Sequence, residues 1–104
     1  MSIGYAYEKF ALAIRGMASS PQNIKDRIRN AHLHFHTLKL DDLPQDSRWK
    51  YEDLITKLTS VRAKENEGSV VASLDAMSDS EAEELARVIV GLHDEIKIAY
   101  ENQR

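Results

Sequence analysis

Cysteine is absent from this chain of 104 residues. The protein can therefore form no disulfide, use no thiolate nucleophile and bind no metal through sulfur. Proline and glycine are scarce, with two and four residues, which argues against disorder. Glu8, Lys9 and Arg15 interrupt the N-terminal apolar residues, so this stretch lacks the continuous apolar block of a signal peptide or membrane helix. We therefore expect a soluble cytoplasmic protein with no membrane partner.

The composition indicates one folded domain. With 42% hydrophobic and 30% charged residues over 104 positions, the chain is long enough to bury one core, so we expect a single domain over residues 1–104. The net charge of -3 is unevenly distributed. Residues 1–40 carry six Lys and Arg against two acidic residues, whereas residues 41–104 carry eight against fifteen. We expect helices of opposite charge to pack together and pair their surface charges.

The stretch from Ser78 to Asn102 predicts one long helix with a defined start. Ser78 and Glu81 have the spacing of a capping box, in which each residue accepts a hydrogen bond from the backbone N–H of the other. Apolar residues then recur every three or four positions and form one buried stripe: Ala82, Leu85, Ile89, Leu92, Ile96 and Ala99. Val90 and Ile98 lie off this stripe. We expect such a helix to be the central one of the fold, or half of a subunit interface.

Three earlier segments show the same helical spacing, and none alternates apolar and polar residues as a half-buried strand would. Their apolar positions are Ile3, Tyr7, Phe10, Ile14 and Met17 in the first, Ile24, Ile28, Ala31, Phe35 and Leu38 in the second, and Tyr51, Leu54, Ile55, Leu58 and Val61 in the third. A short helix is expected at Val70, Leu74 and Met77. The sequence therefore predicts an all-α, up-and-down helical bundle of four main helices plus one short helix before the last.

The breaks between these helices follow from turn and cap residues. Ser20 followed by Pro21 has the composition of an N-cap and a first helical position, which predicts that the second helix starts there. Pro44 is expected near the start of the third helix. Residues 62–68 contain no large apolar side chain, so we expect them to form an exposed and mobile link.

Three histidines in the second segment form the densest group of side chains with functional chemistry. In a helix, His32 and His36 lie one turn apart on one flank, and His34 lies on the other. A histidine pair at this spacing can chelate zinc if a further ligand joins it, so metal binding through His32 and His36 is one alternative function. Only His93 or a carboxylate from another helix could supply that ligand. The simpler interpretation is that these imidazoles reach solvent beside the apolar seam, with no cofactor.

Arg29, Asn30 and His34 form the pattern Arg-Asn-x-x-x-His, which resembles the catalytic signature of the HEPN ribonucleases, small helical proteins that cleave RNA across a dimer cleft. The resemblance implies that Arg29 would neutralise the phosphate, Asn30 would orient the substrate, and His34 would act as the general acid or base. It implies no metal requirement. A HEPN-like, metal-independent ribonuclease is therefore the enzymatic alternative.

Basic residues gather on the second segment as well. Lys25, Arg27, Arg29 and Lys39 are the main concentration of positive charge. Nucleic-acid-binding domains usually carry more positive charge overall or aromatic residues interleaved for base stacking, whereas the isoelectric point of this chain is about 5.8. We therefore favour a protein partner over a nucleic-acid partner.

Several large apolar residues lie away from the main seams, and they suggest a binding surface. A small bundle does not readily bury all of these side chains in full, and tryptophan is common among the residues that anchor interfaces. The residues off the seams are Trp49, Leu12, Leu33, Val90 and Ile98. Gly91 costs up to about 1 kcal/mol relative to alanine in mid-helix, which is best explained if another helix comes close there. The leading hypothesis is a non-enzymatic regulatory or interaction protein that binds another protein and forms a homodimer through the last helix.

Overall fold

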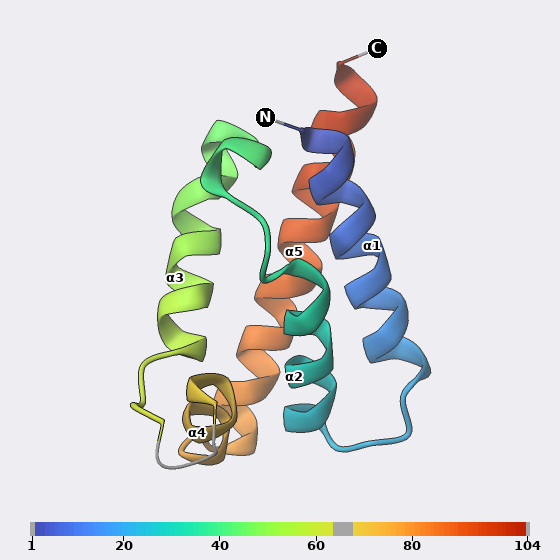
Figure 1. The fold of residues 1–104 in the computed structure, drawn as a ribbon. Helices are drawn as coiled ribbons and strands as arrows, with labels where there is room; N and C mark the ends of the chain where they lie inside the picture. Colours follow the sequence, from blue (N-terminus) through green and yellow to red (C-terminus); the bar gives the residue numbers. More distant parts are fainter. Residues whose placement is uncertain (1, 64–67, 104) are drawn as a thin grey trace.

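The computed structural model describes residues 2–63 and 68–103 as an all-α, up-and-down bundle, which confirms the predicted fold class. Successive long helices run in alternating directions (Figure 1). The helices are α1 (Ile3–Ser19), α2 (Ile24–Phe35), α3 (Arg48–Leu58), the short α4 (Ser69–Asp75) and α5 (Asp79–Asn102), with 3-10 turns η1 (Leu40–Asp42) and η2 (Gln45–Ser47) before α3. No helix in the described ranges has the length and apolar character needed to cross a membrane.

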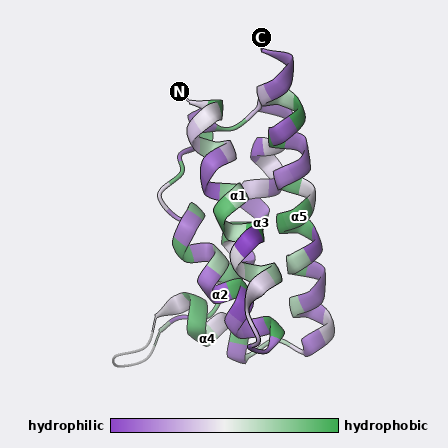
Figure 2. Cartoon of the chain, turned by 90° about the vertical axis from the view of Figure 1, so that its right-hand side faces the viewer, coloured by the Kyte–Doolittle hydropathy of each residue, from purple (hydrophilic) through white to green (hydrophobic). Residues whose placement is uncertain are grey.

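Helix α5 is the element against which the other long helices pack. It contacts α1, α2 and α3, and its predicted apolar stripe is the face that it buries. The buried positions of this stripe are Ala82, Leu85, Ile89, Leu92 and Ile96. Figure 2 shows α5 along one edge of the molecule, with its other side turned to solvent. One helix thus closes the core and also presents a long outer face.

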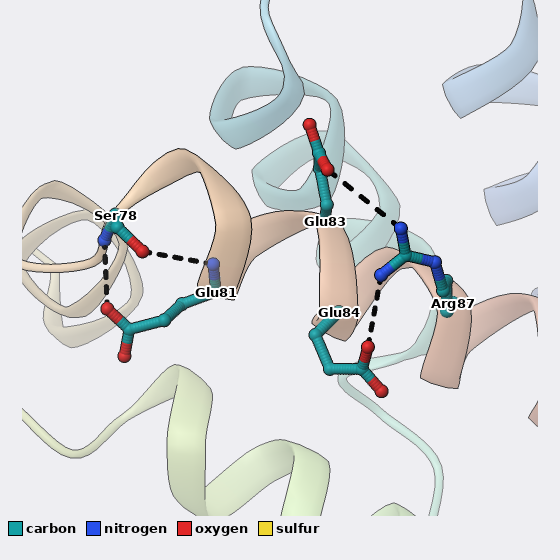
Figure 3. A network of polar contacts seen from close by, with 5 residues as sticks. All are labelled: Ser78, Glu81, Glu83, Glu84 and Arg87. Carbon is teal, nitrogen blue, oxygen red and sulfur yellow. Dashed lines mark hydrogen bonds and ion pairs between the residues drawn. The ribbon is translucent and has the colours of Figure 1, made fainter.

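The start of α5 is set by the predicted capping box (Figure 3). The Glu81 N–H donates to the Ser78 hydroxyl at 3.1 Å, and the Ser78 N–H donates to the Glu81 carboxylate at 3.1 Å. The bond from the Ser78 backbone N–H, followed by that with its side chain, lowers the pKa of Glu81. These bonds satisfy two of the donors that a helix start leaves unpaired.

Aromatic rings join α1, α2 and α3 at the centre of the core. Phe10 stacks on Phe35 with the ring centroids 4.8 Å apart, and Tyr51 meets both rings edge-on. The buried Tyr51 hydroxyl donates to the Phe35 carbonyl at 2.9 Å, at the last residue of α2. Burial, and to a lesser degree the charge of Asp42, raises the pKa of Tyr51 to about 12. Tyr51 therefore both fills the core and satisfies a carbonyl at a helix end.

The predicted start of α2 at Ser20 is wrong. The Ser20 N–H donates to the Gly16 carbonyl at 3.2 Å, so this residue still closes the last turn of α1. The N-cap of α2 is Asn23, whose side chain accepts from the Asp26 N–H at 3.0 Å. Asparagine is at least as good an N-cap as serine, and here it lies where the chain turns back toward the bundle.

Helix α3 also ends earlier than its apolar spacing predicted. The helix ends at Leu58, and Val61 lies beyond it, where its N–H donates to the hydroxyl of the buried Ser73 at 2.9 Å. The chain therefore leaves the helix to make a contact with α4. Of the link expected over 62–68, residues 64–67 lie outside the described residues.

Replacing Ser78 with alanine is expected to lower the free energy of unfolding by about 1 kcal/mol, because one capping bond is lost and the reciprocal one is loosened. Urea unfolding followed by circular dichroism measures this change. Ser80, exposed in the same first turn, is the matched control, and its alanine variant should retain nearly the full stability. Equal stabilities of the two variants would contradict the capping role.

Candidate functional site

Trp49 is the most exposed large apolar residue of the candidate binding surface. It lies in the first turn of α3, and its side chain is 66% exposed. The Lys50 ammonium lies 5.8 Å from the centroid of the indole ring, within the range of a cation–π contact. Tryptophan side chains are mostly buried in folded domains, so an indole this exposed is uncommon. Tryptophan is also enriched among the residues that anchor interfaces.

A groove runs between α3 and α5 beside this indole. It has a volume of about 320 Å³ and is lined by Trp49, Lys50 and Asp53 from α3 and by Glu84, Arg87, Val88, Gly91 and Glu95 from α5. At Gly91 a Cβ atom would meet no other atom within 4 Å. No described segment of this chain therefore explains the glycine, although the sequence led us to expect a helix near it. Two residues singled out separately from the sequence, Trp49 and Gly91, thus line the same groove.

Polar contacts hold the two walls of the groove in place. At one end the hydroxyl of the buried Ser47 donates to Glu95 at 2.8 Å, and the Lys50 ammonium forms an ion pair with the same carboxylate. On α5, Arg87 pairs with Glu84 at 3.0 Å and with Glu83 at 3.9 Å (Figure 3). The charged side chains named here are thus paired with one another along the groove.

The remaining two predicted interface residues lie on the outer side of α5. Ile98 is 58% exposed and Val90 is 43% exposed. At 100° per residue, Ile98 lies within about 20° of Gly91 around the helix axis, and Val90 lies about 100° away. Ile98 thus lies on the groove side of α5, two turns beyond Gly91. Val90 lies on the adjacent outward face.

Sequence reasoning missed the polar residues of this surface, above all Arg87 and Glu95. A signal was present, because a second set of positions on α5 repeats the four-and-three spacing of the buried stripe. These positions are Glu84, Val88, Gly91, Glu95 and Ile98. The set mixes charged, apolar and glycine residues, so it does not stand out as a hydrophobic seam. Which of its members face α3 depends on tertiary packing.

The histidine pair has the predicted one-turn spacing. The rings of His32 and His36 have centroids 5.6 Å apart, and His32 packs edge-on against Phe35. Burial, followed by the nearby charge of His36, lowers the pKa of His32. Within residues 2–63 and 68–103, no group of three or more His, Cys, Asp or Glu side chains is arranged to hold a metal ion. The pair therefore has two ring nitrogens to offer a metal and no third ligand from this part of the chain.

The three residues of the HEPN-like pattern point in different directions. His34 follows Arg29 by five positions, which places the two about 140° apart around α2. Arg29 is exposed, and the His34 ring lies against α1, where its Nε2 would be 4.0 Å from a Cβ at Gly16. The Asn30 amide donates to the side chain of Gln22 at 2.9 Å. Arg29 and His34 thus project from different sides of one helix.

Two of the basic residues on α2 are used to stabilise the fold. The Lys25 ammonium donates to the Met77 carbonyl at 2.5 Å, which ties α2 to the junction of α4 and α5, and the Arg27 guanidinium donates to the Gln22 carbonyl at 2.7 Å. The expected ion pairing between basic α2 and acidic α5 is not found among the described residues. An ion pair does reach α5 from α3, between Lys50 and Glu95.

The lowered pKa of His32 predicts a loss of stability in mild acid. The unfolded chain takes up a proton near pH 6.5, whereas the folded chain resists it, so the free energy of unfolding should fall as pH drops through 6.5 and level off below the folded pKa. Urea unfolding at pH 7.5 and 5.5 measures this change. His32→Gln should reduce the difference between the two pH values more than His93→Gln does. An unchanged difference in the His32 variant would contradict the assignment.

Comparison with known proteins identifies no relative for this arrangement, because the chain matches no protein-family model, no curated protein and no solved structure. Its function therefore has to be inferred from the residues and contacts of the chain itself.

Proposed function

We propose that this protein is a non-enzymatic interaction protein that acts by binding another macromolecule, and that it forms a homodimer through α5 and the neighbouring part of α3. The observation that carries this proposal is the meeting of Trp49 and Gly91 in one groove. The first supplies a large exposed apolar side chain, and the second supplies a place on α5 where a partner's backbone can approach closely.

The chemistry of the groove supports binding over catalysis. The residues that flank the indole form ion pairs and hydrogen bonds with one another, which orients them and reduces the cost of bringing a partner close. Val88 on the groove wall and Ile98 farther along α5 add apolar area beside Trp49. An exposed aromatic anchor within a rim of paired charges is a common pattern of protein interfaces.

Light scattering across a wide concentration range tests the proposal. We expect a mass approaching twice the 11.8 kDa of one chain as concentration rises. Trp49→Ala should raise the dimer dissociation constant by roughly tenfold or more, because truncating an aromatic anchor typically costs about 2 kcal/mol of binding free energy. The fold should be unaffected, since the indole is largely exposed.

Leu33 provides the matched control for this experiment. It is 62% exposed, as open as Trp49, but it lies on α2 and does not line the groove. Leu33→Ala should leave the dissociation constant unchanged. A strict monomer at every concentration, or an equal effect of the two substitutions, would contradict the proposed interface.

A further inference from the structure

We propose that the two copies meet through antiparallel α5 helices related by a twofold axis that passes between Val90 and Gly91. This inference rests on the homodimer proposed above and specifies its geometry. It follows from the outer face of α5, where apolar residues, an open glycine and charges of both signs occur in a particular order along the helix.

The position of the axis follows from where α5 can be approached most closely. The space around Gly91 is open, and Val90 beside it is 43% exposed. Packed helices have axes about 8–10 Å apart, and the shortest separations need small residues at the crossing point. Gly91 lies near the middle of the 24-residue α5, so a crossing there leaves about 17 Å of helix on either side for further contacts.

The order of charges then favours the antiparallel direction. An axis between Val90 and Gly91 brings together residues that are equally far from it on the two copies. Arg87 of one copy then faces Asp94 of the other, and by symmetry Asp94 of the first faces Arg87 of the second. Arg87 and Asp94 are seven positions apart, so they lie within about 20° of each other on the same side of α5. In a parallel pair each of these residues would lie beside its own equivalent, with like charges together, which is unfavourable.

The side chains concerned are placed to make these contacts. The Arg87 side chain is 67% exposed and that of Asp94 is 65% exposed. Arg87 pairs with Glu83 and Glu84 on its own helix (Figure 3). Because a guanidinium has five N–H donors, Arg87 can keep these contacts and still donate to a carboxylate of the second copy.

Trp49 extends this contact beyond the two α5 helices. Stable interfaces bury about 1,200–2,000 Å² in total, so contacts outside the helix crossing matter for its stability. The indole of each copy stands at the groove edge beside Gly91, where it can cover the flank of the opposite α5. Ile98, 58% exposed on the same side of α5, adds apolar area farther from the axis.

Charge reversal combined with light scattering tests this geometry. Arg87→Glu places an introduced glutamate opposite Asp94 twice in the dimer, and Asp94→Arg places two arginines together twice, so each single variant should raise the dissociation constant roughly tenfold. The double variant, Arg87→Glu with Asp94→Arg, recreates both opposite-charge pairs and should dimerise about as well as the original protein. An equimolar mixture of the two single variants should also form heterodimers.

The variants also separate this geometry from a parallel one, in which each reversal would only replace one like-charge pair by another, so weakening followed by recovery would not be seen. Arg15→Glu is the control, since Arg15 is exposed on α1 and does not line the groove. Its dissociation constant should not change. Circular dichroism shows whether each variant remains folded.

The outcomes separate the two proposals. A wild-type protein that stays monomeric overturns the homodimer and this geometry together. A dimer that Trp49→Ala weakens but both single charge reversals leave intact overturns the antiparallel geometry and retains the interface. Weakening by each single reversal followed by recovery in the double variant supports both.

Discussion

The bundle depends on one apolar stripe along α5. This stripe is in contact with three other helices, so its burial sets where α1, α2 and α3 lie. Burying a large aliphatic side chain contributes about 1.5–3 kcal/mol, and Leu85, Ile89, Leu92 and Ile96 are all almost fully buried. The capping box at Ser78 fixes the residue at which the helix begins. It thereby favours the register in which these four side chains face the core.

A second constraint ties α3 to another side of the same helix. Glu95 accepts a hydrogen bond from Ser47 and pairs with Lys50, which are close neighbours of Trp49 at the start of α3. The contact fixes the start of α3 against α5 and so holds the indole at the edge of the groove. The position of the exposed tryptophan is therefore a consequence of a polar contact on the groove wall.

The sequence was sufficient to predict the helices because their apolar residues follow a three-and-four spacing that a strand cannot satisfy. It was less informative at the boundaries. Both Ser20 and Asn23 are good N-caps, and only the geometry of the turn decides that Ser20 closes α1 while Asn23 opens α2. Val61 continues the spacing of α3, yet its N–H bonds to Ser73 after the helix has ended. Turn geometry decided the first case, and a contact with α4 decided the second.

The residues of the candidate surface could be predicted only in part, because the way they come together depends on contacts between helices. Trp49, Val90 and Ile98 stood out because they lie off the apolar seams, and all three are exposed. The sequence contained no indication that Trp49 and Gly91 share a groove, because that depends on how α3 lies against α5. Nor did the overall charge asymmetry identify Lys50 as the partner of Glu95. Local spacing identifies candidate residues, and packing decides which of them meet.

The two faces of α5 also limit how its length can vary. A residue inserted or deleted near the middle of the helix would rotate everything beyond it by about 100°. Leu92 and Ile96 would then leave the core, and Ile98 would leave the outer face at the same time. Substitutions on the outer side can change how the surface binds while the core stays intact. A one-residue insertion or deletion in the middle of α5 would therefore alter both faces at once.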